Sequence, residues 1–545
     1  MRKFIPLALL LLAIIVIATF YFGDREPEQT ELAGKPEQIK AVHYFSSSWP
    51  KSFWGDFEYS QVDSDFAQIK ADGFNTIILV IPWMGFEINF GDDGSEPSEL
   101  YERLDWLLAK IEEADLAYGL RVSFPHNFDP QTGTTNARLC TDIFLDSGLR
   151  ESWIQYLSRI AERVDQHRDS FKFAFFSWED FFCPYVSFPN MSKDQRLDMA
   201  RRSGYQDWLS ERYPLQLLEM LYNERLGSMQ LIPVPERGSA AFLLFLQFVD
   251  QFLIEQLIEP GREVLPELAM EVRVDKDLIQ NNSEIFWAGH DLAQSDEQLR
   301  GSYWGAYYGA NNQGELLTAK QALVNFEFML NEVSDHGKNI NHIVEQFNFA
   351  DNTPGFAGHA KIDEQELPAF LQGAAELLKQ KSRGYGLWAY RDYVDSAIYN
   401  GSFELGLRGW ETQGEAEIIL NSDGDQALHM QTGAVISQTY NPYERFAGLG
   451  SDKQITFCAN FTKMTEAARI TLLLNGVPYA ELDINDTSQN CSVMDAQAIQ
   501  QSEVVFSVMT DAEIQIDDLR LYSYVQILDV YDKDGHPGAL RDLIV

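Results

Sequence analysis

Histidine and cysteine are scarce in this chain, whose 545 residues include nine His and four Cys. Neither residue type occurs at the spacing of a metal site, such as a CxxC pair or a His cluster, so the sequence does not indicate metal-dependent catalysis. Basic residues are also few: 42 Lys and Arg stand against 82 Asp and Glu, which gives a net charge of −40. The sequence has no basic stripe, which argues against binding to nucleic acid and against docking on anionic lipid through basic patches.

The sequence also lacks internal repeats, low-complexity segments and a Gly-rich phosphate loop after the first predicted strand. The missing loop argues against a doubly wound nucleotide-binding sheet, which is the alternative to the fold predicted below. Hydrophobic residues make up 45% of the chain and aromatic residues 13%. A chain of this length and composition can bury sizeable cores in about two to four domains.

The N-terminus predicts export. Arg2 and Lys3 precede an uncharged apolar run from Phe4 to Phe22, which is about as long as a membrane-spanning helix. The end of this run is a poor cleavage site, so we expect residues 1–23 to remain as a membrane anchor. The bulk of the protein would then face the periplasm or the outside of the cell. The alternative is a signal peptide that is cleaved, followed by secretion. Residues 24–38 are polar and predict a linker.

The four cysteines are consistent with export, because disulfides persist in oxidising compartments. Four cysteines allow three pairings. Cys140 and Cys183 belong to the first predicted domain, and Cys458 and Cys491 belong to the second. We therefore expect the disulfides Cys140–Cys183 and Cys458–Cys491, which require no bridge between domains.

Between residues 39 and 397, short apolar runs alternate with helical patterns, which predicts an α/β fold. The eight predicted strands are Ile39–Tyr44, Asn75–Ile81, Tyr118–Phe124, Phe171–Ser177, Leu268–Val274, Gly301–Tyr308, His342–Phe347 and Gly384–Tyr390. A mainly helical insertion, residues 184–267, follows the fourth strand. This order predicts a (β/α)8 TIM barrel with a helical insertion after strand four.

Residues 398–545 change to an alternation of apolar and polar residues, as in Arg469–Leu474 and Glu513–Asp517. Turn signals such as Asn475–Gly476 separate the predicted strands. The pattern predicts an all-β sandwich of the jelly-roll type.

In a parallel barrel, catalytic groups project from the C-terminal ends of the strands. Glu179 follows the fourth predicted strand and Glu345 lies in the seventh. A pair of carboxyl groups is the minimum machinery of glycoside hydrolysis. Aromatic and polar residues at the other strand ends are candidates for substrate binding: Tyr44, Trp83, His126, Asn127, Trp178, Asp275, Trp304, Tyr307, Tyr308 and Trp388.

Some of these residues have structural alternatives. Packing in the core is the commoner role for a Trp, and this applies to Trp83 and Trp304. His126 and Asn127 suit substrate binding and loop capping about equally. Glu271, Arg273 and Asp275 alternate along one strand face, which predicts an ion-pair network inside the barrel, with Asp275 as its candidate substrate contact.

Three segments resemble the retaining (β/α)8 glycoside hydrolases of the cellulase and β-galactosidase type, whose two catalytic glutamates end strands four and seven. They are Phe175–Asp180, His342–Phe347 and Gly386–Tyr393. The resemblance implies that Glu179 is the general acid/base, that Glu345 is the nucleophile and that Trp388 lies under the sugar. It also implies cleavage of β-glycosidic bonds in a poly- or oligosaccharide, with net retention and without a catalytic cofactor.

The resemblance leaves two other functions open. The family has Asn before the acid/base, where this chain has Trp178. This difference motivates the alternative of a catalytically inactive barrel that binds polysaccharide in an exopolysaccharide export assembly. A transglycosylase would use the same residues and differ only in the acceptor.

Asn400–Trp410 and Ile516–Leu521 resemble the first and last strands of carbohydrate-binding-module-like jelly rolls. The resemblance implies a structural calcium in the C-terminal domain, with Glu404 and Asp518 among its oxygen ligands. The alternative is an exposed acidic turn. Glycan binding and a purely structural role remain equally open for this domain.

Overall fold

The computed structural model describes residues 38–55, 59–86, 100–123, 136–176, 188–272, 274–275, 286–287, 297–308, 310–334, 339–350, 359–420, 426–440, 454–464, 468–484, 490–495, 504–523 and 525–544. The predicted anchor in residues 1–23 and most of the linker lie outside these ranges. Within them, the structure contains no helix with the length and apolar character needed to cross a bilayer.

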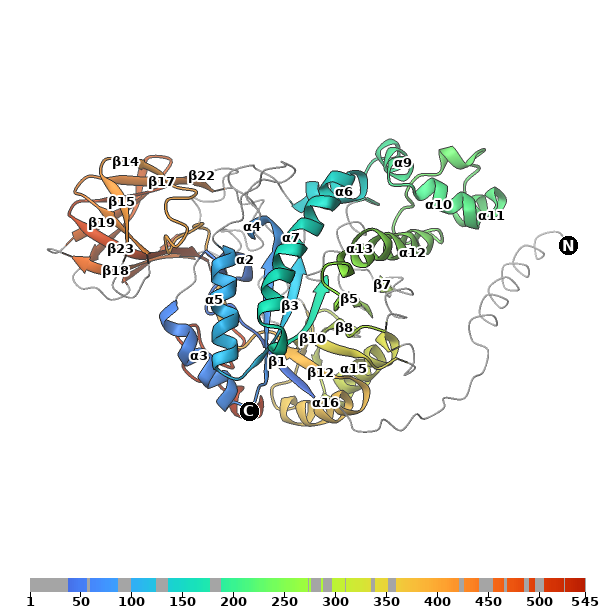
Figure 1. Ribbon diagram of the computed structural model, residues 1–545, viewed down its shortest axis with the longest axis horizontal. Helices are drawn as coiled ribbons and strands as arrows, with labels where there is room; N and C mark the ends of the chain where they lie inside the picture. Colours follow the sequence, from blue (N-terminus) through green and yellow to red (C-terminus); the bar gives the residue numbers. More distant parts are fainter. Residues whose placement is uncertain are drawn as a thin grey trace. The chain divides into compact units, whose positions relative to one another are not determined.

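Eight parallel strands close into a barrel, which confirms the predicted (β/α)8 fold (Figure 1). In order around the barrel they are β1 (Ile39–His43), β2 (Thr76–Pro82), β3 (Ala117–Ser123), β4 (Phe171–Phe176), β5 (Leu268–Val272), β8 (Arg300–Gly305), β10 (His342–Asn348) and β12 (Gly384–Leu387). The barrel closes where β1 pairs with β12.

Each predicted strand corresponds to one barrel strand, and the boundaries shift most at the sixth and eighth strands. The sixth strand, β8, ends at Gly305, three residues before the predicted end. The Tyr308 backbone N–H donates to the Gly305 carbonyl at 3.0 Å and closes a turn there. The eighth strand, β12, ends at Leu387. Tyr307 and Tyr308 therefore lie in a turn beyond the barrel sheet.

The helices bury apolar faces against the strands. Those that flank the barrel are α3 (Tyr59–Ala71), α5 (Leu100–Glu113), α7 (Ser147–Gln166), α15 (Ala319–Val333) and α16 (Leu367–Lys381). Helix α5 buries Leu104, Leu107, Leu108 and Ile111, a helical spacing that the sequence shows directly. Helices α5 and α7 are in contact and run side by side along the barrel (Figure 1).

The insertion between β4 and β5 is helical, as predicted. Its helices are α9 (Lys193–Arg202), α10 (Tyr205–Arg212), α11 (Leu215–Leu221), η2 (Met229–Leu231), α12 (Phe242–Leu253), the π-helix η3 (Ile254–Ile258) and α13 (Glu259–Arg262). Helix α12 is largely buried, which explains its continuous apolar sequence. Short elements complete the barrel part: α2 (Pro50–Phe53), α4 (Trp83–Phe86), α6 (Asn136–Leu145), η1 (Arg168–Ser170), β6 (Val274–Asp275), β7 (Phe286–Trp287), β9 (Leu316–Leu317), β11 (Lys361–Ile362) and β13 (Tyr393–Val394).

Two five-stranded antiparallel sheets follow and confirm the predicted β-sandwich. One contains β14 (Glu411–Gln413), β17 (Val435–Tyr440), β22 (Val504–Thr510), β19 (Ala468–Leu474) and β20 (Val477–Ile484). The other contains β15 (Ala416–Leu420), β16 (Gln426–Met430), β23 (Ile514–Tyr522), β18 (Gln454–Met464) and β21 (Asn490–Asp495). The predicted boundary between residues 397 and 398 lies between β13 and β14.

One predicted disulfide is confirmed. Cys458 on β18 and Cys491 on β21 are directly opposed in the antiparallel ladder, and their sulfur atoms are bonded at 2.05 Å. The other predicted pair is not described: Cys140 belongs to α6, but its side chain and the whole of Cys183 lie outside the described residues. The Cys140–Cys183 disulfide therefore stays a prediction.

The C-terminal segment, which carries β24 (Val525–Gln526) and α17 (Arg541–Ile544), returns to the barrel. Strand β24 pairs with β13. The carboxylate of Asp72, after α3, accepts hydrogen bonds from the hydroxyl groups of Tyr390 and Tyr531 at 2.6 Å each and from Arg541 at 2.8 Å. This carboxylate therefore fastens the end of the chain to the barrel.

Candidate active site

The barrel interior is apolar in the half nearer the N-terminal ends of the strands. Side chains from five strands pack together there: Ile39, Ala41, Ile78, Phe173, Phe175, Ala269 and Ile343. Where a strand contributes two of them, they stand two positions apart, as inward-facing residues do. A Cβ atom on Gly119 of β3 would lie 2.1 Å from the Phe173 ring, so only glycine leaves room for this ring. These side chains fill the barrel and form the floor of any site above them.

A polar layer begins two residues further along the strands, on the side of their C-terminal ends. It consists of His43 on β1, Arg121 on β3, Glu271 on β5, and Glu345 and Gln346 on β10. We call these five residues the luminal cluster. Arg121, Glu271 and Glu345 are 0% exposed. Buried charges are costly unless they are paired, so the contacts among these side chains decide whether the layer is stable.

Arg121 connects the luminal cluster. Its Nε lies 3.1 Å from Oε2 of Glu345, and its Nη2 donates to Oε2 of Glu271 at 3.3 Å. Its Nη1 donates to Oε1 of Gln346 at 3.1 Å and lies 3.2 Å from Nε2 of His43. One guanidinium thus contacts side chains from three other barrel strands, which suits its five donors in a planar arrangement.

The imidazole of His43 accepts from this cation. Burial, and then the nearby Arg121 charge, hold the pKa of His43 well below its usual value, so the ring is neutral. Its Nδ1 lies 3.2 Å from the Leu387 carbonyl oxygen. A proton on Nδ1 serves this carbonyl and leaves the Nε2 lone pair for Arg121. The described charges of the luminal cluster are therefore one guanidinium and the two carboxyl groups that it contacts.

Glu345 occupies an irregular position in its strand. The register between β10 and β8 shifts between Ile343 and Gln346, and the register between β10 and β12 shifts between Val344 and Phe347. Both shifts enclose Glu345. Such irregularities re-aim a side chain and are common beside active sites.

A glycine on the neighbouring strand makes room for the redirected carboxylate. A Cβ atom on Gly301 of β8 would lie 3.0 Å from Cγ and 3.1 Å from Oε1 of Glu345. Any larger residue at this position would therefore press on the glutamate side chain.

Trp388, directly after β12, lies against the luminal cluster. Its ring centroid is 4.8 Å from that of His43, and the Arg121 guanidinium carbon is 5.8 Å from it. Phe45 and Trp49 pack on the same indole at 5.3 and 6.0 Å. An indole held in this way brings an aromatic surface beside the buried carboxylates, where the sequence places a sugar platform.

Three other predicted substrate-binding residues lie between the strands and the surrounding helices. The Tyr44 hydroxyl donates to Asp65 of α3 at 2.9 Å. Trp83 is fully buried and packs near Tyr156 of α7. Trp304 packs on Phe326 of α15 and Phe370 of α16. These contacts correspond to the structural alternative that the sequence offered for Trp83 and Trp304.

Tyr307 and Tyr308 are both buried in the turn after β8. The Tyr307 hydroxyl lies 2.7 Å from that of Tyr303, and the Tyr307 ring packs on His359 with centroids 4.0 Å apart. The two tyrosines pack on each other with a centroid distance of 5.2 Å. They form an aromatic group directly after the C-terminal end of β8.

The remaining candidates are not placed. His126, Asn127, Trp178 and Glu179 lie outside the described residues, as does Arg273. Asp275 ends the short strand β6, which pairs with β7, and its side chain is not described. The pairing of Glu179 with Glu345 therefore stays a prediction. The predicted ion-pair network inside the barrel includes Glu271, which pairs with Arg121 from β3.

Sequence reasoning did not assign a site role to His43, Arg121 or Gln346. A signal was present at Arg121, because an arginine between Leu120 and Val122 in a buried strand must face something that compensates its charge. His43 gave a similar signal at the end of an apolar strand. Neither residue indicates its partners in sequence, since those come from strands far along the chain.

Glu404, one of the two predicted calcium ligands, has protein partners at both of its carboxylate oxygens. Oε2 of Glu404 pairs with Arg103 of α5 at 3.1 Å, and Oε1 accepts from the backbone N–H of Gln426 at 2.8 Å. Arg103 also donates to the Glu404 and Trp54 carbonyl oxygens at 2.5 Å each. The Arg103 guanidinium therefore engages one carboxylate oxygen of Glu404 and a backbone N–H engages the other, so Glu404 does not fit a calcium ligand.

Asp518 has different contacts. Its Oδ2 accepts from Arg520 at 2.6 Å, while its buried Oδ1 has no hydrogen-bond partner among the described residues. Among all the residues that the structure describes, no group of three or more His, Cys, Asp and Glu side chains is arranged to hold a metal ion.

No protein-family model matches the chain, and no curated protein matches it. Among solved structures, the chain is similar to the exo-β-1,4-mannosidase Op5Man5 from Opitutaceae bacterium strain TAV5, with 13% identity and a TM-score of 0.41 over 66% of this chain and 54% of that chain. It is also similar to a GH5_18 protein from Streptomyces cattleya in complex with GlcNAc, with 13% identity and a TM-score of 0.40 over 66% and 72% of the two chains. A β-glucosidase, 1317, gives 14% identity and a TM-score of 0.37 over 65% and 88%. The chain thus spans about half the length of Op5Man5.

Proposed function

We propose that this protein is a glycoside hydrolase that cleaves β-glycosidic bonds of a poly- or oligosaccharide with net retention. The observation that carries the proposal is the environment of Glu345. Its carboxylate is buried in the barrel interior, is redirected by a strand irregularity, and pairs with Arg121 at 3.1 Å beside Trp388. A buried carboxylate with this much dedicated structure around it is typical of a functional group.

Glu345 would act as the nucleophile. The Arg121 guanidinium favours the charged form of the carboxylate and fixes the position of Oε2. Glu271 shares this guanidinium, so the positive charge is not given to Glu345 alone. This sharing leaves Glu345 more nucleophilic than a carboxylate with an arginine to itself.

Glu179 would act as the general acid/base, as the sequence resemblance implies. In the first step a Glu345 oxygen attacks the anomeric carbon while Glu179 protonates the departing glycosidic oxygen. In the second step Glu179 takes a proton from water, the water oxygen attacks the anomeric carbon, and the bond to Glu345 breaks. Two inversions at the same carbon give net retention.

We further propose that the protein acts outside the cytoplasm, where residues 1–23 anchor it to the cell membrane. The proposal is supported by the uncharged run from Phe4 to Phe22 and by the Cys458–Cys491 disulfide, which suits an oxidising compartment. A site held near the membrane would suit trimming of an exopolysaccharide during synthesis or export.

Trapping of the glycosyl-enzyme tests the hydrolase. The full chain is incubated with activated 2-deoxy-2-fluoro-β-glycosides of glucose, mannose and galactose, and the labelled peptide is located by mass spectrometry. We expect a label on Glu345. Glu345→Gln should abolish labelling and lower turnover of aryl β-glycosides by at least about a thousandfold, whereas Glu271→Gln should slow labelling without moving it.

A second measurement separates a lost nucleophile from a lost fold. Azide added to Glu345→Ala should restore turnover of an activated aryl glycoside and give the α-glycosyl azide, because azide enters the space of the missing carboxylate. Folded protein that forms no adduct with any of the three donors would refute the hydrolase. The alternative of a polysaccharide-binding barrel, which is motivated by Trp178 at the position where the family has Asn, would then take its place.

A further inference from the structure

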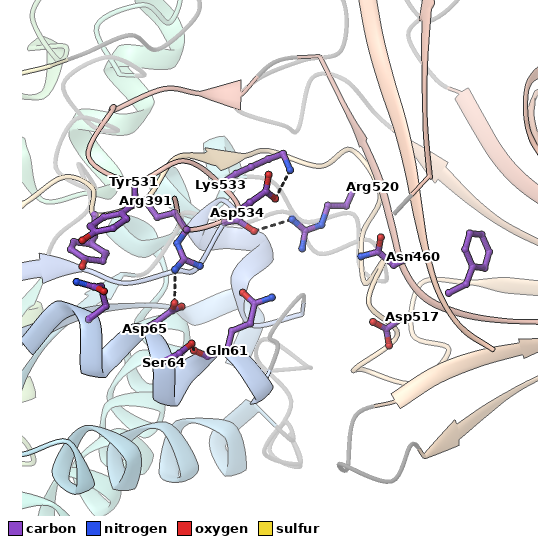
Figure 2. Close-up of a pocket in the computed structure, with 15 residues that line it drawn as sticks. Gln61, Ser64, Asp65, Arg391, Asn460, Asp517, Arg520, Tyr531, Lys533 and Asp534 are labelled. Carbon is purple, nitrogen blue, oxygen red and sulfur yellow. Dashed lines mark hydrogen bonds and ion pairs between the residues drawn. The ribbon is translucent and has the colours of Figure 1, made fainter. Parts of the chain in front are cut away.

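A cleft lies where the barrel meets the β-sandwich, and it shares no residue with the luminal cluster. Its volume is about 630 Å³, within the range of small-molecule sites, which often lie where two domains meet. Gln61, Ser64 and Asp65 of α3 project into it from one side, and Asn460 of β18 and Asp517 of β23 lie on the other (Figure 2).

On the barrel side, one face of helix α3 forms the wall of the cleft. Gln61, Ser64, Asp65 and Gln68 follow the spacing of a single α-helical face, and all four line the cleft. On the same helix, Val62, Phe66 and Ile69 are buried. Helix α3 therefore packs its apolar face on the barrel and turns a row of amide, hydroxyl and carboxylate groups toward the cleft.

The charges that line the cleft balance each other, although the whole chain carries −40. The lining contains three acidic residues, Asp65, Asp517 and Asp534, and three basic residues, Arg391, Arg520 and Lys533. Each basic residue has a carboxylate partner: Arg391 pairs with Asp65, Arg520 with Asp518 at 2.6 Å, and Lys533 with Asp534 at 2.6 Å. An anion would therefore find all three cations already engaged, and two of the three lining carboxylates, Asp65 and Asp534, are engaged with them.

The lining also disfavours an apolar ligand. The rings of Tyr390, Phe461 and Tyr531 belong to it, but each of these residues is nearly fully buried and packs in the protein. An apolar group would cover amide, hydroxyl and charged groups without replacing their hydrogen bonds to water, which costs free energy. A neutral ligand rich in hydroxyl groups is neither charged nor apolar. Each of its hydroxyls can donate to a carboxylate and accept from an amide or a guanidinium.

One acceptor in the cleft is already buried without a partner. Oδ1 of Asn460 is shielded from solvent and receives no hydrogen bond within the described part of the chain. Asn460 stands opposite Asp518 in the ladder between β18 and β23, and the buried Oδ1 of Asp518 is in the same condition. These two buried acceptors lie directly behind the cleft wall, so a variant at Asn460 changes the amide of a lining residue.

We propose that the cleft between α3 and the sandwich strands β18 and β23 binds a neutral oligosaccharide. The class of ligand, a neutral polyhydroxylated molecule, follows from the balanced charges and the polar lining. Only the choice of a saccharide among such molecules rests on the proposed hydrolase function. Glycan bound here would keep the polymer attached to the protein while the barrel acts on it.

The test uses saturation-transfer NMR and calorimetry on the full chain with Glu345→Gln, so that the probes are not consumed. The probes are neutral β-1,4-linked tetrasaccharides of glucose, mannose and galactose, with tetragalacturonate and chitosan tetramer as charged controls. Ser64→Trp fills the cleft from α3. Its matched control is Ala67→Trp, because Ala67 is also exposed on α3 but does not line the cleft.

We expect at least one neutral tetrasaccharide to bind, with the affinity lowered by at least about tenfold in Ser64→Trp and unchanged in Ala67→Trp. Asn460→Leu, which keeps the branched arrangement of heavy atoms and removes the amide, should weaken binding of the same probe. Both cleft variants should retain cooperative unfolding. The proposal is overturned if no neutral probe binds, if Ser64→Trp and Asn460→Leu leave binding unchanged, or if a charged probe binds more tightly than the neutral ones.

The two proposals fail separately. If no adduct forms on Glu345 but a neutral probe binds and Ser64→Trp abolishes its binding, the hydrolase is refuted and the cleft proposal stands. If the adduct forms on Glu345 but Ser64→Trp leaves probe binding unchanged, the hydrolase stands and the cleft proposal is refuted.

Discussion

The replacement of Arg121 by Met should destabilise the protein strongly. Met is an unbranched side chain of similar volume, so the substitution chiefly removes the charge and its hydrogen bonds. Two carboxyl groups, those of Glu271 and Glu345, are fully buried on the same guanidinium at 3.3 and 3.1 Å. Removal of one partner from a buried ion pair costs about 3–5 kcal/mol, because the remaining charge is left uncompensated.

Two further substitutions show whether uncompensated charge is the cause. Arg121→Met with Glu271→Gln removes one of the two carboxylates that lose this cation, so the double variant should recover at least about 1 kcal/mol relative to Arg121→Met alone. Arg168→Met is the matched surface control. Arg168 also pairs with two carboxylates, Asp165 and Glu267, but it is 37% exposed, and its loss should cost less than about 1 kcal/mol.

The assay is equilibrium unfolding in urea, followed by tryptophan fluorescence and by circular dichroism, with the slope compared between variants. A loss below about 1 kcal/mol for Arg121→Met would refute the argument, because it would mean that the two carboxylates are stable in the barrel without the cation. A double variant that is less stable than Arg121→Met would also contradict it.

Three further predictions concern the attachment of the C-terminal parts. Burial alone would raise the pKa of Asp72, but the hydroxyl groups of Tyr390 and Tyr531 and the Arg541 guanidinium together hold it below its usual value. A lowered folded-state pKa stabilises the fold above the unfolded value and loses this effect as the pH falls through the folded value. Asp72→Asn should thus cost about 1.5–3 kcal/mol at pH 7, and its difference from the wild type should shrink below about pH 4; a pH-independent difference in urea titrations would contradict this. Cys458→Ala with Cys491→Ala opens a loop of 33 residues and should cost about 3–4 kcal/mol, seen as a lower calorimetric Tm of the sandwich; an unchanged Tm would count against it. Arg103→Met should lower the Tm in a way that calcium does not reverse, and EDTA should leave the wild-type Tm unchanged; a fall with EDTA that calcium restores would contradict this by showing a stabilising calcium.

The sequence was sufficient for the architecture. The apolar run that became β2 is continuous because strands of a barrel are covered on both faces, and β10 is likewise buried at every position although it carries polar residues. The alternating runs that became β19 and β23 mark strands with one covered face. Strand ends were less certain. Turn hydrogen bonds, such as that from Tyr308 to Gly305, terminated strands inside runs that remain apolar.

The candidate site was predictable only in part. Glu345 was identified because a charge in an apolar strand is expensive without a purpose, and its complete burial agrees with that reasoning. Trp83 and Trp304 were candidates because they end strands. Their side chains, however, pack toward the helices. Trp83 begins α4, and the direction of Trp304 depends on the alternation within β8, and so on where this strand begins.

The pattern of apolar and polar residues by itself determined the barrel, its helical insertion, the sandwich and the Cys458–Cys491 bridge, because each follows from local periodicity or from pairing within one domain. Only the tertiary structure decided that Arg121 serves both Glu271 and Glu345, that Arg103 takes the contacts expected of a calcium ion at Glu404, and that a charge-balanced cleft forms beside α3. Each of these joins side chains from distant parts of the chain. Which distant groups meet depends on strand register and domain packing, which are set by the sum of many weak contacts and leave no mark at the individual positions.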